Sequence, residues 1–231
     1  MPRVPRWLQL ARDAAYHVMT RGHNREALFA DADDTRSFLG LLDRYRRRFG
    51  LRLYHYCLMT NHVHLLLQLD DPRRLSALMA GLLLAYVRYF NGRHGFVGHL
   101  VQGRFKSPAV QREGYWLSCG RYIERNPLAA GLVAVPWDYP WSSCRAYACG
   151  EADPLLTEDP CYTELSPDPA RRRQLWREFL CGDDPREEAI ARGGWAVGDD
   201  GFRGRMAQVL GRPLPRPRGR PPKAKTAEEH L

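Results

Sequence analysis

Lysine is scarce in this sequence, and paired cysteines and long apolar runs are absent from it. Only three of the 35 basic residues are lysines. No uncharged apolar stretch approaches the roughly 18 residues that a membrane span needs, and the first residues lack the apolar core of a signal peptide. None of the six cysteines forms a C-x-x-C pair, which argues against a zinc knuckle or a disulfide framework. We therefore expect a globular cytoplasmic protein with reduced thiols and no membrane partner.

Positive charge is distributed unevenly along the chain. Residues 1–150 hold 21 basic and 11 acidic side chains, residues 151–202 hold 6 and 13, and residues 203–231 hold 8 and 2. Arginine carries a planar fork of donors that matches phosphate oxygens, so the excess favours a nucleic-acid partner. A GC-rich genome explains the ratio of arginine to lysine equally well, but it does not explain the asymmetry of charge.

Apolar periodicity predicts an α+β fold with the element order β-α-β-β-α-β-α. We expect strands at 14–20, 51–59, 62–69 and 102–111, and helices at about 34–49, 74–90 and 113–126. Pro127 and Gly131 should end the last helix. This order is that of a ferredoxin-like fold, an antiparallel sheet with helices on one face. Residues 136–143, rich in proline and aromatic side chains, should wrap over the domain in an ordered, irregular path.

Composition divides the chain into three parts. We expect a catalytic domain at 1–147, a helical C-terminal extension at 148–210 with helices near 170–180 and 201–210, and a disordered basic tail at 211–231. Arg218 and Arg220 in the tail belong to an Arg-Gly-Arg sequence that resembles an AT-hook, which inserts into narrow minor grooves. A non-specific electrostatic tether is the alternative, and both predict DNA binding that salt weakens. The acidic segment 151–202 has no assigned role.

His62 and His64 flank Val63 inside a predicted strand. Residues two apart on a strand face the same side, so both imidazoles project together. Two such histidines make half of a site for a divalent metal. Two imidazoles that only form hydrogen bonds would produce the same pattern.

Tyr122 and Asn126 are four residues apart in the last predicted helix and therefore share one face. If that face meets the histidines, a phenol and an amide oxygen join them. A metal, a nucleophile and a basic surface together indicate phosphodiester chemistry. The alternatives are that Tyr122 is a packing residue and that Asn126 is an ordinary helix terminus before Pro127.

Four sequence stretches, in this order, resemble the single-tyrosine HUH transposases and specifically the REP-associated tyrosine transposases. They are YHVMTRG at 16–22, YCLMTNHVHLLL at 56–67, QGRFK at 102–106 and RYIERNPLAAGLV at 121–133, followed by WDYPWSS at 137–143. The resemblance covers roughly residues 10–147. It implies a ferredoxin-like catalytic domain, Mg²⁺ or Mn²⁺ bound by His62 and His64, Tyr122 as the nucleophile, and single-stranded DNA with hairpins as the substrate. It also implies a third metal ligand four residues after the tyrosine, at Asn126.

Four basic residues are candidate DNA contacts near this site. Arg21 and Arg25 flank the first loop, and Arg104 and Lys106 alternate along the predicted fourth strand. A solvated basic face is an equal alternative for each of them. His23 and His55 receive no role.

We expect a transposase that nicks and rejoins hairpin-bearing single-stranded DNA through a 5′-phosphotyrosine link. It would act as a monomer or a homodimer, associated with the nucleoid. The alternatives are a domesticated protein that binds structured nucleic acid without cutting it, and a metal-dependent hydrolase of small phosphoesters.

Overall fold

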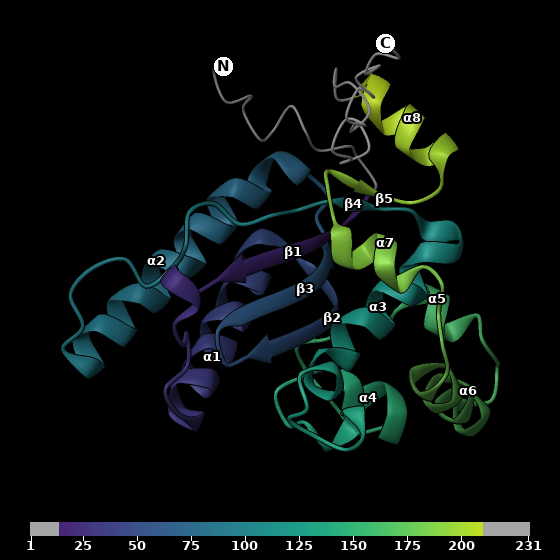
Figure 1. Cartoon of the computed structure of the whole chain (residues 1–231), viewed down its shortest axis with the longest axis horizontal. Coiled ribbons are helices and arrows are strands. Elements are labelled where there is room, and N and C mark those ends of the chain that lie inside the picture. The colour runs from purple at the N-terminus through teal and green to yellow at the C-terminus, as the bar shows by residue number, and fades with distance from the viewer. Residues whose placement is uncertain (1–13, 210–231) are drawn as a thin grey trace, which may run out of the picture.

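One five-stranded sheet organises the computed structural model, which describes residues 14–209 (Figure 1). The strands are β1 (Ala15–Arg21), β2 (Arg52–Met59), β3 (His62–Gln68), β4 (Ala109–Val110) and β5 (Ala196–Val197). They lie in the order β2-β3-β1-β4-β5. β1 pairs antiparallel with β3 and β4, and β2 antiparallel with β3, whereas β5 joins β4 in parallel. The first four strands and their helices confirm the predicted ferredoxin-like α+β fold.

Helices α1 (Ala32–Phe49) and α2 (Leu75–His94) cover one face of this sheet. The Asp31 side chain accepts hydrogen bonds from two backbone N–H groups of the first turn of α1, and so caps that helix. Gly50 and Gly95 end α1 and α2 in the left-handed conformation. Both helices pack against alternate strand residues, among them Val18 and Leu65. Short 3-10 helices η2 (His23–Arg25), η3 (Pro72–Arg74) and η4 (Pro136–Asp138) lie in the connections.

Helix α3 (Arg112–Ala129) lies on the opposite face of the sheet. Cys57 and Leu66, which alternate with the residues facing α1 and α2, pack against Trp116 and Ile123 of this helix. The expectation that helices cover only one face is therefore wrong for α3. The central strands bury side chains on both faces, and each buried face needs a cover.

The predicted strand at 102–111 is reduced to β4 and isolated bridges. Lys106 bridges to Met19, and Val101 bridges to Gly22. Pro108 has no N–H to donate, so it interrupts the ladder along β1. Arg104 and Lys106 therefore do not alternate along a regular strand.

We had expected helix α3 to end at Pro127, but it continues through this residue to Ala129. A proline inside a helix leaves the carbonyl four residues earlier, here that of Ile123, without its usual donor. The side-chain amide of Asn126 donates to the carbonyls of Ile123, at 3.3 Å, and of Tyr122, at 2.7 Å. Asn126 thus supplies the hydrogen bond that the proline cannot.

The chain after α3 wraps over the domain. Residues 136–143 follow β2, where Leu58 donates to the carbonyl of Trp141 at 2.9 Å, so the ordered irregular path is confirmed. Beyond it lie α4 (Cys144–Cys149), α5 (Pro160–Thr163), α6 (Pro169–Cys181), α7 (Glu187–Arg192) and α8 (Asp200–Val209). The extension also contributes β5, which is too short to show periodicity in the sequence. None of the helices within residues 14–209 is long and apolar enough to cross a membrane.

Candidate active site

The sheet, α3 and the 102–106 segment surround a cavity of about 790 Å³. Most of the predicted site residues line it: Arg21, His62, His64, Arg104, Lys106, Tyr122 and Asn126. Arg25 is exposed on η2 and does not belong to this lining. Arg218 and Arg220 lie outside the described residues. The structure therefore brings the candidate nucleophile, the candidate metal ligands and three basic residues to one place.

In both His62 and His64, the ring nitrogen Nδ1 has a partner, which leaves Nε2 as the candidate metal-binding atom. His62 Nδ1 lies 2.7 Å from Asn61 Oδ1, and His64 Nδ1 lies 2.8 Å from His17 Nε2. Burial lowers the pKa of His62 to about 4 and that of His64 well below 6.5. Both imidazoles are neutral near pH 7, which is the form that binds divalent metals.

Asn126 directs an oxygen towards His62. Its amide nitrogen is occupied by the carbonyls of Tyr122 and Ile123, so Oδ1 is the atom left to interact with the His62 ring. Since His62 Nδ1 already contacts Asn61, Nε2 is the ring nitrogen left for that oxygen. Imidazole nitrogens and an amide oxygen around one point fit a divalent cation with positions open for a phosphate.

The third candidate ligand is an amide and not a carboxylate. Among residues 14–209, no group of three or more His, Cys, Asp or Glu side chains gathers at a possible metal site. A neutral amide leaves more of the cation's charge available for an anionic phosphate than a carboxylate would.

Tyr122 packs against the histidines within the same chain. Its ring lies edge-on to His17 and His64, with centroid separations of 5.8 Å in both cases. Burial raises the pKa of the Tyr122 phenol, and Arg21 opposes that rise. The phenol is thus protonated near neutral pH, so it needs a nearby cation to act as a nucleophile.

His17 is a site residue that the sequence did not predict. It lies fully buried on β1, on the same face as His64. Its Nδ1 has no hydrogen-bond partner within the described part of the chain, and burial lowers the pKa of His17 to about 3. The one signal in the sequence was the position of His17 within a segment of alternating polarity, which forms the strand next to that of His62 and His64.

A fully buried ionic network fixes α3 further along the same sheet face. His55 Nδ1 lies 2.7 Å from a Glu124 oxygen, and His55 Nε2 lies 2.8 Å from an Asp159 oxygen. The indole N–H groups of Trp176 and Trp116 donate to the same two carboxylates, each at 2.9 Å. The sequence carries no signal for this network, because the two carboxylates lie 69 and 104 residues after His55.

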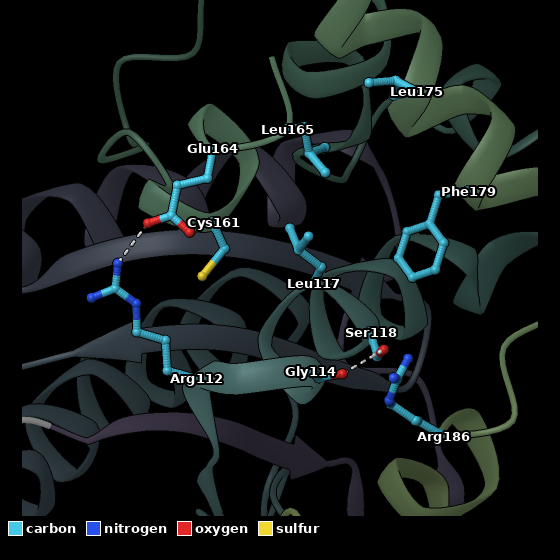
Figure 2. A pocket seen from close by; sticks show the side chains of 10 residues that line it. All are labelled: Arg112, Gly114, Leu117, Ser118, Cys161, Glu164, Leu165, Leu175, Phe179 and Arg186. Atoms are coloured by element: carbon cyan, nitrogen blue, oxygen red, sulfur yellow. Dashed lines mark hydrogen bonds and ion pairs between the residues drawn. The ribbon is translucent and has the colours of Figure 1, made fainter. Parts of the chain in front are cut away.

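A second cavity, of about 780 Å³, lies between the first half of α3 and α5 and α6 (Figure 2). Leu117 and Phe179 point into it. Its polar groups are already engaged, since Arg112 binds Glu164 at 2.9 Å and Ser118 donates to a carbonyl of its own helix. No histidine is among the labelled lining residues, so the histidine cavity is the better candidate for phosphoryl chemistry.

Comparison with known proteins identifies the family and the fold. Residues 11–126 match the family model described as "Transposase IS200 like". Among solved structures, the chain is similar to a REP-associated tyrosine transposase bound to a REP hairpin, at 14% identity and a TM-score of 0.56, over 69% of this chain and 92% of that one. No curated protein matches. The structural match shows a shared fold, and the family match spans half of the chain. The protein therefore belongs to the IS200-like transposase family.

Proposed function

We propose that this protein nicks and rejoins single-stranded DNA beside hairpins, with Tyr122 as the nucleophile. The observation that carries the proposal is the convergence of Tyr122 with His62 and His64 in a cavity lined by basic residues. Membership of the transposase family supports a DNA-cleaving enzyme. The hairpin bound to the structurally similar transposase supports a hairpin-bearing substrate.

In the proposed reaction, the Tyr122 hydroxyl oxygen bonds to phosphorus while the bond from phosphorus to the 3′ oxygen breaks. Mg²⁺ or Mn²⁺ held by His62, His64 and Asn126 would polarise this phosphate and offset its charge. The phenol proton leaves and the departing 3′ oxygen gains one, so the products are a 5′-phosphotyrosine and a free 3′-hydroxyl. Attack by another 3′-hydroxyl reverses the step and rejoins DNA without ATP.

Basic residues around the cavity would hold the phosphates that flank the scissile one. Arg21, Arg104 and Lys106 line the cavity directly. Arg25, exposed on η2, would contact DNA further from the reacting phosphate. Arg218 and Arg220 of the tail add a tether for duplex or hairpin DNA. Such contacts predict affinity that falls steeply with salt concentration.

The test is covalent capture of DNA. The protein is incubated with Mn²⁺ and 3′-labelled single-stranded oligonucleotides that cover the DNA flanking its gene, with any palindromic repeats found there, and labelled protein is sought on a denaturing gel. We expect an adduct with wild type and none with Tyr122→Phe, because only a phenol can form the phosphotyrosine.

Tyr115→Phe is the matched control, since Tyr115 is another half-buried tyrosine of α3 that does not line the histidine cavity. It should form the adduct as wild type does. An adduct of normal yield with Tyr122→Phe would show that Tyr122 is not the nucleophile. Hairpin binding by wild type with no adduct would favour a nucleic-acid-binding protein that does not cut.

A further inference from the structure

We infer that Asn61 is a positioning residue of the metal site, which holds His62 with Nε2 free and links it to the exposed loop at 22–26. The inference rests on the proposed metal site. Asn61 is the second residue of the two-residue turn between β2 and β3, immediately before His62. It is not among the candidate ligands, and it does not line the cavity.

The orientation of the Asn61 amide follows from its partners. Its nitrogen lies 2.9 Å from the backbone carbonyl oxygen of Arg25, and a carbonyl can only accept. The NH₂ group must therefore face Arg25, and Oδ1 must face His62 Nδ1, 2.7 Å away. Because Oδ1 can only accept, a His62 ring with a single proton carries it on Nδ1 and has its lone pair on Nε2.

This tautomer places two acceptors opposite each other. The Asn126 side chain interacts with the His62 ring, and its amide nitrogen is held by the backbone of α3, which leaves its oxygen for the ring. With Nδ1 engaged by Asn61, the ring nitrogen left for that oxygen is Nε2, which carries the lone pair. Two acceptors attract each other only through a shared cation or proton. Asn61 thus keeps His62 from turning an N–H towards Asn126, an arrangement that would satisfy both groups and block metal binding.

The loop that orients Asn61 is tightly constrained. The backbone carbonyl of Asn61 accepts a hydrogen bond from Gly22 N–H at 2.8 Å. Asn24 and Arg25 adopt positive φ angles of 48° and 66°, which side chains other than glycine rarely adopt. A Cβ at Gly22 would lie 2.1 Å from the Glu26 carbonyl oxygen. The exposed loop that carries a candidate DNA contact is therefore fixed to the residue that sets the His62 ring.

Two substitutions separate the functions of the Asn61 side chain. Asn61→Leu has a similar size but no acceptor for His62. Asn61→Asp keeps an oxygen for His62 and loses the donor to Arg25. Thr60→Ala, at the exposed neighbouring turn position, is the control, because it leaves every hydrogen bond of the Asn61 side chain in place.

Mn²⁺ affinity is measured without DNA, by the paramagnetic resonance signal of free Mn²⁺. The His62 tautomer is read in metal-free protein from the ¹⁵N shifts of its ring, assigned by comparison with His62→Gln. We expect Asn61→Leu to weaken Mn²⁺ binding about 10- to 100-fold, the usual effect of losing an outer partner of a ligand histidine, and to shift the ring away from the Nδ1–H form. Asn61→Asp should retain both properties, and Thr60→Ala should match wild type.

The inference is overturned if Asn61→Leu binds Mn²⁺ as tightly as wild type or keeps the His62 ring in the Nδ1–H form. It is equally overturned if Asn61→Asp loses affinity as far as Asn61→Leu does. Absence of Mn²⁺ binding by wild type would instead overturn the proposed metal site. The two failures are therefore distinguishable.

Discussion

Gly120, one residue before the Arg121–Tyr122 pair, lacks a side chain because the His55 ring occupies that space. A Cβ at position 120 would lie 2.6 Å from His55 Nε2. In an ordinary helix interior, glycine to alanine stabilises by roughly 0.5–1 kcal/mol. The His55 ring is held on both sides by carboxylates and cannot move aside, so we expect Gly120→Ala to destabilise the protein by about 1–3 kcal/mol, as overpacking does. Urea unfolding measures this change.

The matched control for Gly120→Ala is Gly40→Ala, in the middle of α1. Apart from its chain neighbours and the backbone of its own helix, no described atom lies within 4 Å of a Cβ built at Gly40. This variant should gain roughly 0.5–1 kcal/mol, the ordinary helix-propensity difference. A similar gain in both variants would show that the His55 network yields easily, contrary to our expectation.

At the residue scale, local spacing predicted more of the site than composition did. Alternation along a strand placed His62 and His64 together, and helical spacing placed Tyr122 and Asn126 together. His17 was missed because its contact with His64 crosses between strands 47 residues apart in sequence. No periodicity within one element reveals such a pair, so the hydrogen bonds around the ligands had to come from the structure.

At the element scale, His55 joins three segments: β2, which carries it, α3 through Glu124, and the N-terminus of α5 through Asp159. The Asp159 side chain also caps α5 by accepting from two of its backbone N–H groups. Burial lowers the pKa of His55, but Glu124 and Asp159 outweigh burial and raise it to about 9. His55 is therefore an imidazolium at neutral pH and donates to both carboxylates.

This charge predicts how stability changes with pH. The folded pKa of about 9 lies above the ordinary value of 6.5, so the stabilisation is fully present below pH 6.5 and is lost as the pH rises through 9. His17, His62 and His64 have lowered pKa values and oppose this trend up to about pH 7.5. We therefore expect the free energy of unfolding to fall between about pH 7.5 and 8.5, where His55 alone among these histidines changes its charge. Chemical denaturation at a series of pH values measures it. A flat profile over this range would show that His55 is neutral in the folded protein.

Helices and strands were predictable from the sequence where the apolar pattern extends over many residues, and not where it covers only a few. The four longest elements matched their expected ranges within a few residues, because each has an apolar face of several turns or alternations. The face on which α3 lies was not predictable, since Trp116 and Ile123 would pack equally well on either side of the sheet. The prediction of a long fourth strand was wrong because Pro108 has no N–H and interrupts the hydrogen bonds to β1. Its neighbours nevertheless show the alternation of a strand.

At the scale of the whole molecule, the acidic segment holds the helix that carries the candidate nucleophile. Arg121, almost fully buried, donates to the carbonyls of Phe179, at 2.7 Å, and Gly182, and pairs with Glu187. Arg125 donates to the carbonyl of Leu180. Arg121 and Arg125 of α3 thus place positive charge at the C-terminal end of α6, where the helix dipole is negative. The role of this segment was not evident from charge alone, because its partners lie on α3.

These contacts predict that Tyr122 acts with the histidines of its own chain. Exchange of α3 between two chains would require the Arg121 contacts to open and the buried Glu124 to leave the His55 of its own chain before a partner could replace them, which is costly for a buried charge. We therefore expect that a mixture of Tyr122→Phe with His62→Ala/His64→Ala protein forms no DNA adduct, although each variant supplies what the other lacks. Wild type mixed with either variant serves as the positive control in the same covalent-capture assay. An adduct in the mixture of the two variants would mean that α3 passes to a partner chain, and that the contacts with α6 open before DNA is cut.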